Sequence, residues 1–429
     1  MPSPTTSTGT AAGGLGTEPP HGGSTIVAPI LVNPSPPVVH PTRSAAPGTD
    51  PVKPGEPVHE KHWYDRIQIR GYTQLRYNRL WATNDKFKND FADKSIAAGS
   101  GFFIRRGRLI VQGDVHDHLF LYFQPDFAGA ANGDALNLAQ LRDLYGDISI
   151  DKKKEFRFRV GQSKVPFGWE NMQSSQNRAP LDRSDAINTA APSERDLGIF
   201  AYWAPEHVRK RFKMLVDSGL KGSGDYGVVG LGVYNGQALN FLDRNSEKHF
   251  VGRVTWPFEF GDQVVEVGVA GYYGKYRIKR DAGYSAHVAG GSDDDFDDGR
   301  GEASFTLYPK PIGLQVEYTV GRGPELDPGT KIVRTKTLYG GYAMLMARFG
   351  EPEGPYGAFT PYVRFQAYDG GRKSDANAAA IVTKELEAGL EWQVWKSVEL
   401  TVAYANSQRT VNWVRQDGQL LRTQIQINY

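Results

Sequence analysis

The last eleven residues of the chain, 419–429, read QLLRTQIQINY and carry the most information about the fold class. From Leu421 onward apolar and polar side chains alternate, and the run ends on the aromatic Tyr429. Because successive side chains of a strand point to opposite sides, one face of this strand is apolar and the other polar. A soluble sandwich would expose the polar face to water, whereas an outer-membrane barrel turns the apolar face to lipid and the polar face to a lumen. The rest of the chain decides between these two classes.

The same alternation recurs along the chain. In residues 65–78, Ile67 and Leu75 fall on one face and Arg70 on the other. Residues 155–161 and 385–394 repeat the pattern with charged side chains opposite the apolar face. The strands of a two-sheet sandwich are usually shorter, and its chain is rarely this long without a second domain. The pattern therefore favours an all-β, transmembrane antiparallel barrel.

Length and composition exclude several other classes. The chain has 429 residues, of which 23% are charged. It contains no run of the roughly 18 uncharged apolar residues that a membrane-spanning helix needs. The formal net charge of +2 gives no sign of a nucleic-acid partner. The absence of cysteine excludes disulfides, thiolate catalysis and cysteine-ligated metals.

The connections between predicted strands fall into short turns and long polar loops, as outer-membrane barrels require. Aromatic residues crowd the short-turn ends and resemble an interfacial girdle: Trp256, Phe258, Phe260, Tyr308, Trp392, Trp395 and Tyr429. A direct count gives about 17 strands, an odd number that would place the two termini of the barrel's chain on opposite sides of the membrane. We assign the extra hairpin, within residues 197–224, to an outer excursion and predict about 16 strands.

Residues 1–60 differ from the rest of the chain. They hold 13 of the 26 prolines and no Phe, Trp or Tyr. Such a segment cannot bury enough apolar surface to offset its ordering entropy, so we predict a disordered Pro/Gly/Ser/Thr-rich periplasmic linker, with the barrel in residues 61–429. A loose tail is favoured over one that binds a cell-wall or envelope partner. The segment shows no basic and apolar export signal, which we expect to be absent from this chain.

Several motifs resemble the phosphate-selective porin O and P family. They are VGQSKVPFGWE at 160–170, Ser174-Ser175, DRS at 182–184, RDLG at 195–198 and FIRR at 103–106. The resemblance implies an outer-membrane porin, usually a trimer of sixteen-stranded barrels, whose third outer loop, here residues 164–194, folds inward. It also implies that Arg105 and Arg106 match the paired arginines near the family's anion path. The extra lysines of phosphate-specific members are missing at 116–118 and 173–177, so a dedicated phosphate site does not follow.

The face assignment predicts two groups of lumen charges. Alternation places Arg66, Arg70, Arg76, Arg106, Arg108, Arg157 and Arg159 in the lumen. With Arg105, Lys164 and Arg183, which the family resemblance adds, these residues form the candidate anion path. Acidic residues on the late strands form a candidate opposite wall: Glu266, Glu317, Glu385, Glu387 and Glu391. Two such walls would impose a transverse field on passing solutes, whereas ordinary solvated lumen charges would not, and the sequence leaves both interpretations open.

The sequence thus predicts an outer-membrane porin, a water-filled passive diffusion channel for small hydrophilic solutes and ions with a modest anion preference. The expected partners are outer-membrane lipid and lipopolysaccharide, and other copies of the chain in a homotrimer. No catalytic set, cofactor site, metal site or nucleic-acid surface is expected, and the protein is not predicted to be an enzyme. The alternatives are a structural envelope protein tethered through residues 1–60 and an outer-membrane enzyme with an unrecognised site.

Overall fold

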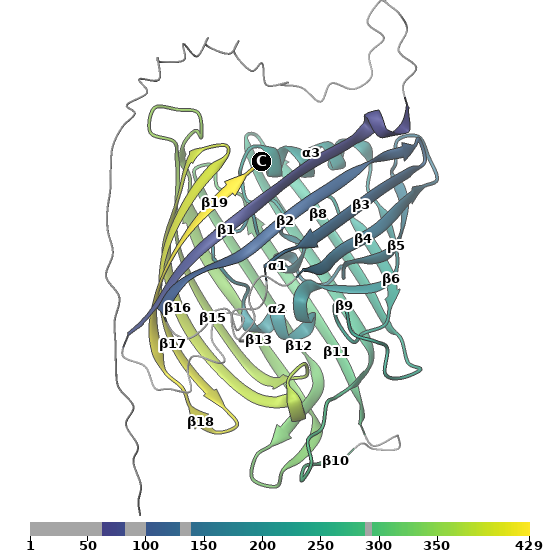
Figure 1. Ribbon diagram of the computed structural model, residues 1–429, viewed down its shortest axis with the longest axis vertical. Helices are drawn as coiled ribbons and strands as arrows, with labels where there is room; N and C mark the ends of the chain where they lie inside the picture. The colour runs from purple at the N-terminus through teal and green to yellow at the C-terminus, as the bar shows by residue number, and fades with distance from the viewer. Residues whose placement is uncertain (1–61, 82–99, 129–138, 288–293) are drawn as a thin grey trace, which may run out of the picture. The chain divides into compact units, whose positions relative to one another are not determined.

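A computed structural model describes residues 62–81, 100–128, 139–287 and 294–429 (Figure 1). Its strands form one sheet that closes on itself, because β1 (Ile67–Trp81) pairs with β19 (Gly418–Asn428) as well as with β2 (Ser100–His116). The wall is a 16-strand antiparallel β-barrel, which confirms the predicted fold class. The predicted linker, residues 1–60, lies outside the described residues, as does most of the predicted loop that follows β1.

The wall strands between β2 and β19 follow one another in chain order around the barrel. They are β3 (Leu119–Asp126), β4 (Gln140–Ser149), β5 (Phe156–Lys164), β6 (Arg195–Trp203), β7 (Val229–Tyr234), β8 (His249–Phe260), β9 (Gln263–Arg277), β11 (Asp295–Leu307), β12 (Ile312–Asp327), β13 (Ile332–Ala347), β15 (Ala358–Arg372), β16 (Ala379–Trp395) and β17 (Val398–Val411). The short strands β10 (Ser285–His287), β14 (Phe349–Gly350) and β18 (Val414–Arg415) extend the sheet at its ends.

The alternation in the sequence sets which face of each strand points outward. Ile69 and Phe102 are 71% and 76% exposed on the outer surface, whereas Gln74 and Arg76 are buried on the inner side. A wall with apolar side chains outside and polar side chains inside suits a barrel that meets lipid on its outer surface. Tyr308 departs from the predicted girdle, because its side chain is buried inside the barrel and its hydroxyl donates to Glu266 Oε2 at 2.5 Å.

A β-bulge changes the simple alternation in β2. Gln74 of β1 lies opposite Arg106, and the next residue, Leu75, lies opposite Ile104, so Arg105 is an extra residue in the ladder. A bulge of this kind places two residues of one strand against a single residue of its partner. Arg105 reaches Asp182 inside the barrel, and Arg106 donates to Gln74 there. Both arginines of the FIRR motif therefore face the lumen.

Helices occur in the connections and not in the wall. The short helix η1 (Trp63–Arg66) precedes β1, and η5 (Ala376–Ala378) lies between β15 and β16. Three short helices lie in the loop between β5 and β6: α1 (Trp169–Met172), α2 (Asp185–Ala190) and η4 (Pro192–Glu194). No helix in the described part of the chain is long and apolar enough to cross a membrane.

The prediction of an outer excursion within residues 197–224 is wrong. β6 is a wall strand, and the connection after it contains α3 (Glu206–Asp217). Trp203, at the end of β6, pairs with Phe156 at the start of β5, so this connection lies at the short-turn end of the barrel. Val208, Phe212 and Leu215 are the buried residues of α3. Their spacing of four and three residues belongs to a helix, so this part of the segment forms α3 and not a hairpin.

Candidate pore constriction

The connection between β5 and β6, residues 165–194 and called loop 3 below, folds into the barrel and is fastened to the late strands at its start. The backbone amides of Trp169 and Glu170 donate to the two carboxylate oxygens of Glu317 on β12, at 2.7 and 3.0 Å. The Trp169 indole donates from Nε1 to Glu266 on β9 at 3.1 Å. A carboxylate that accepts two adjacent backbone amides fixes the first turn of α1 against the wall. The predicted inward-folded third loop is therefore confirmed.

Glu170 ties the same part of loop 3 to the loop itself and to a second wall strand. Its Oε2 accepts from the backbone amide and hydroxyl of Ser184, at 2.8 and 2.9 Å. Its Oε1 accepts from Arg364 on β15 at 3.2 Å. Arg364 also donates to Glu387 on β16 at 3.2 Å. Because these charges are buried together and hydrogen-bonded, the loop is held in one geometry.

Asp182 fastens loop 3 to the opposite side, where the barrel closes. Its carboxylate pairs with Arg76 of β1 at 3.0 Å, with Arg105 of β2 at 3.6 Å and with Arg422 of β19. Burial alone would raise the pKa of Asp182, but the guanidinium groups of Arg76, Arg422 and Arg105 hold it well below its usual range. Asp182 therefore stays ionised at any physiological pH.

Glu194 organises the end of loop 3. It pairs with Arg183 at 3.2 Å, with Lys164 at 3.7 Å and with Arg195. Burial works against its charge, yet these cations hold the pKa of Glu194 well below its usual range. Lys164 also donates from Nζ to the backbone carbonyls of residues 171, 172 and 173, at 2.8, 3.1 and 2.8 Å. Two predicted site residues, Lys164 and Arg183, thus hold the two ends of the loop together.

The predicted arginines of β2 and β5 face inward, and most have carboxylate partners. Arg108 donates to Asp126 at 2.8 Å, to the Tyr72 hydroxyl at 2.7 Å and to Ser175 of loop 3 at 3.2 Å. The two arginines of β5 form ion pairs on the inner side of the wall. Arg157 pairs with Asp225 at 2.8 Å, and Arg159 donates to both carboxylate oxygens of Asp147 at 2.7 and 2.8 Å.

Two further predicted residues lie nearer the short-turn end of the barrel. Arg70 faces inward on β1 and lines a cavity of about 520 Å³ near the short-turn end, called the early-side cavity below. Arg66 lies in η1, outside the wall, and pairs at 2.9 Å with Asp117 in the turn between β2 and β3. Arg66 thus belongs to the rim of the barrel and is not brought together with the other candidates.

The five predicted acidic residues are all buried on the inner side: Glu266, Glu317, Glu385, Glu387 and Glu391. The sequence interpretation missed that late strands also carry inward arginines, among them Arg364, Arg409 and Arg422. Arg422 pairs with Glu387 at 2.7 Å, and Arg409 pairs with Asp185 of loop 3 at 2.7 Å. The period-two pattern contained the signal for these arginines, since each lies on the polar face of its strand. The late side of the lumen therefore carries both signs of charge.

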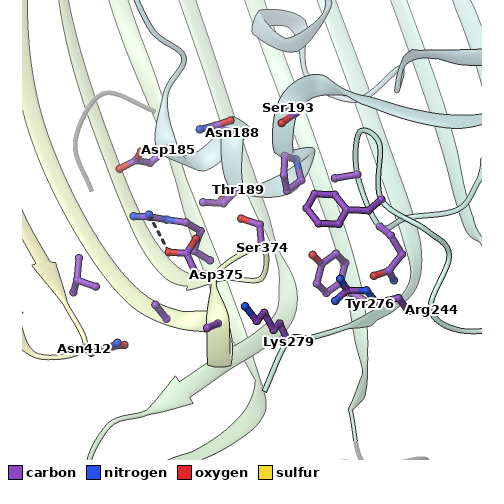
Figure 2. A pocket seen from close by; sticks show the side chains of 18 residues that line it. Asp185, Asn188, Thr189, Ser193, Arg244, Tyr276, Lys279, Ser374, Asp375 and Asn412 are labelled. Carbon is purple, nitrogen blue, oxygen red and sulfur yellow. Dashed lines mark ion pairs between the residues drawn. The ribbon is translucent and has the colours of Figure 1, made fainter. Parts of the chain in front are cut away.

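A cavity of about 780 Å³ lies on the long-loop side of loop 3 (Figure 2). Its lining comes from loop 3, including Asp185, Asn188 and Thr189, and from later connections, including Lys279 and Asn412. The ion pair between Arg372 and Asp375, at 3.0 Å, lies in its wall. Polar and charged side chains, among them Asp185, Asn188 and Lys279, contribute to this entrance, which suits hydrated solutes.

Solved structures of other proteins share this fold. OprB of Pseudomonas putida, in its high-pH structure, is 7% identical over 85% of this chain and 94% of its own, with a TM-score of 0.51. OmpF of Salmonella typhi, in complex with daunomycin, is 11% identical over 85% of this chain and 97% of its own, also with a TM-score of 0.51. At these identities the similarity shows the fold alone. No curated protein sequence matches the chain.

A family model, phosphate-selective porin O and P, matches residues 77–429. The match covers nearly the whole barrel and agrees with the motifs quoted above. The chain therefore belongs to the phosphate-selective porin O and P family and is an outer-membrane β-barrel porin, a channel protein and not an enzyme.

Proposed function

We propose that this porin is a water-filled passive diffusion channel for small hydrophilic solutes and ions, with a modest preference for anions. The observation that carries the preference is the bulge in β2, which turns both Arg105 and Arg106 inward beside loop 3. Arg106 donates to the neutral Gln74 at 2.7 Å, and within the described residues no carboxylate pairs with it. Its positive charge is therefore not cancelled locally, unlike that of Arg108 or Arg159.

The preference is modest because most lumen charges are neutralised in pairs. Guanidinium groups remain charged at any physiological pH and present a planar fork that suits carboxylate and phosphate groups. Mobile ions screen such charges over about 10 Å at 0.1 M salt, so the preference weakens as salt rises. The solute class that follows is small inorganic and organic anions, with cations also passing.

Reversal potentials in a planar bilayer test this proposal. Wild type under a KCl gradient should show weak anion selectivity, and the Arg105→Ala/Arg106→Ala variant should shift toward cation selectivity with little change in open-pore conductance. Arg66→Ala is the matched control, because Arg66 lies at the rim. An unchanged reversal potential in the double variant would show that these arginines do not set the preference.

For assembly we propose a homotrimer in the outer membrane, in contact with lipid and lipopolysaccharide through the apolar outer surface. Family membership and exposed outer side chains such as Ile69 and Phe102 support this assembly. Mass measurement of the detergent-solubilised protein, corrected for bound detergent, tests it. A monomeric mass in mild detergent would contradict it.

A further inference from the structure

The connection between β6 and β7, residues 204–228, crosses the barrel. Lys221 of this connection donates from Nζ to Glu391 Oε1 on β16, and both side chains are buried. Seven of the 16 wall strands separate β6 from β16 in either direction around the sheet. A chain that leaves β6 and reaches the inner face of β16 has therefore traversed the lumen.

The crossing segment also contacts loop 3. The side chain of Gln173 in loop 3 donates from Nε2 to the Lys221 carbonyl at 2.7 Å. Phe212 and Leu215 of α3 belong to the same buried apolar cluster as Trp169 of loop 3 and Tyr308 of the wall. Loop 3 and the connection are thus packed together, with the connection on the short-turn side.

Backbone geometry singles out Lys221 within the segment. Lys221 has a φ of +64°, in the left-handed region that favours glycine, and the nearby Gly219 and Gly224 have φ values of +65° and +96°. A lysine in this conformation is less favourable than a glycine would be. The ion pair with Glu391 gives a physical reason for a charged side chain at this position, since strained residues persist where their surroundings hold them.

The segment divides the short-turn half of the lumen into two cavities. One is the early-side cavity of about 520 Å³. The other, of about 370 Å³ and called the late-side cavity below, lies beside the late strands and is lined by Lys221 and Glu399. Both are lined by the same four residues, Gln176 and Asn177 of loop 3 and Val216 and Asp217 of the connection. Solutes that pass loop 3 on either side therefore meet the connection next.

We propose that residues 204–228 form a second constriction of the channel, and that Lys221 is its positioning residue, holding the segment across the lumen through Glu391. This inference rests on the proposed channel function. Size selection then depends on both loop 3 and the connection, and anions and cations passing the late side meet the charges around Lys221 and Glu399.

Single-channel conductance of three variants tests the role of Lys221. Lys221→Met removes the charge at similar size and should increase conductance and its fluctuations, whereas Lys221→Arg should restore wild-type behaviour. Lys210→Met is the matched control, because Lys210 lies on the exposed side of α3 and, among the residues that the structure describes, pairs only with Glu206 of the same helix. Heat-modifiable mobility in gels checks that each barrel has folded.

A thiol probe tests the constriction without breaking the ion pair. The chain has no cysteine, so Ser218→Cys, in the late-side cavity, introduces a single reactive thiol. A bulky, charged methanethiosulfonate reagent should reduce the current through this variant and leave the current of Lys210→Cys unchanged. The proposed constriction would be wrong, and the channel function unaffected, if the wild type conducts while Lys221→Met leaves the conductance unchanged and modification of Ser218→Cys leaves the current unchanged. A wild type that passes no current would overturn the channel function itself.

Discussion

Asp182, in loop 3, and Arg76, on β1, form a buried ion pair with an Oδ2–Nη1 distance of 3.0 Å. The same carboxylate binds Arg422 on β19, the strand that pairs with β1 to close the barrel. One loop residue therefore neutralises guanidinium groups on both sides of the closing seam. The constriction and the closure of the barrel depend on the same charge.

Replacing this carboxylate should loosen loop 3. Asp182→Asn leaves Arg76 and Arg422 without their shared counter-charge, and breaking a buried pair by removing one partner typically costs about 3–5 kcal/mol. We expect higher open-pore conductance, stronger anion selectivity and a lower unfolding temperature in detergent. Asp243→Asn, which changes an aspartate paired with Lys248 in an exposed loop, is the control. Unchanged conductance and selectivity in Asp182→Asn would contradict the role of this residue.

The effect of Asp182 should not depend on pH between 7 and 4. Its pKa in the folded protein is held well below the ordinary value of about 3.9 for an aspartate. A group with a lowered pKa stabilises the fold fully above its unfolded pKa, and this contribution is lost only as the pH falls toward the lowered value. The difference in conductance between wild type and Asp182→Asn should therefore be similar at pH 7 and pH 4. A difference that falls by about half at pH 4 would show that Asp182 titrates normally, because an aspartate with an ordinary pKa is about half ionised at that pH.

Trp169 should be a strong anchor of loop 3. Its side chain is 2% exposed and packs with the apolar cluster that includes Tyr308 and Phe212. Trp169→Ala should destabilise the protein by about 3–5 kcal/mol, the usual cost of removing a buried aromatic side chain. Thermal unfolding followed by circular dichroism measures the loss. Trp413→Ala, at an exposed tryptophan in the connection between β17 and β18, should change stability little.

A charged side chain on the outer face of the wall should destabilise the barrel. Leu386 is 52% exposed on the outer side of β16, and Arg at this position should cost about 2–4 kcal/mol if it lies near the membrane midplane. Gln393→Arg, on the same strand but lining the late-side cavity, should be tolerated. Unfolding in urea from lipid vesicles compares the two variants. Equal damage from both would mean that the faces of β16 are assigned in reverse.

Barrel assembly should depend on the pairing of β19 with β1. The backbone amide and carbonyl of Tyr429 both bond with Gly71, at 3.0 and 2.6 Å. Deleting residues 424–429 removes the partners of β1 residues 72–76 and should abolish heat-modifiable protein in the outer-membrane fraction. Tyr429→Phe keeps these backbone bonds and should fold normally. Recovery of folded barrel from the deletion variant would show that closure does not need this pairing.

The alternation of side chains was enough to predict the barrel, its approximate strand number and the inward arginines of β1, β2 and β5 other than Arg105. This information is local, because neighbouring residues of a strand always point to opposite faces. The same rule places Arg422 on the polar face of the final strand, although Arg422 was not included among the candidate lumen charges. The helical spacing of Val208, Phe212 and Leu215 was likewise present in the sequence, although the segment was assigned to a hairpin in an outer excursion.

Only the tertiary structure decided which charges meet. Arg422 and Asp182 lie 240 positions apart, and Lys221 and Glu391 lie 170 apart, so their pairing depends on barrel closure and on the paths of loop 3 and residues 204–228. The bulge that turns Arg105 inward depends on the register between two strands, which no single strand encodes. Local periodicity thus determined the wall, whereas the long-range contacts that cross the lumen determined the constriction.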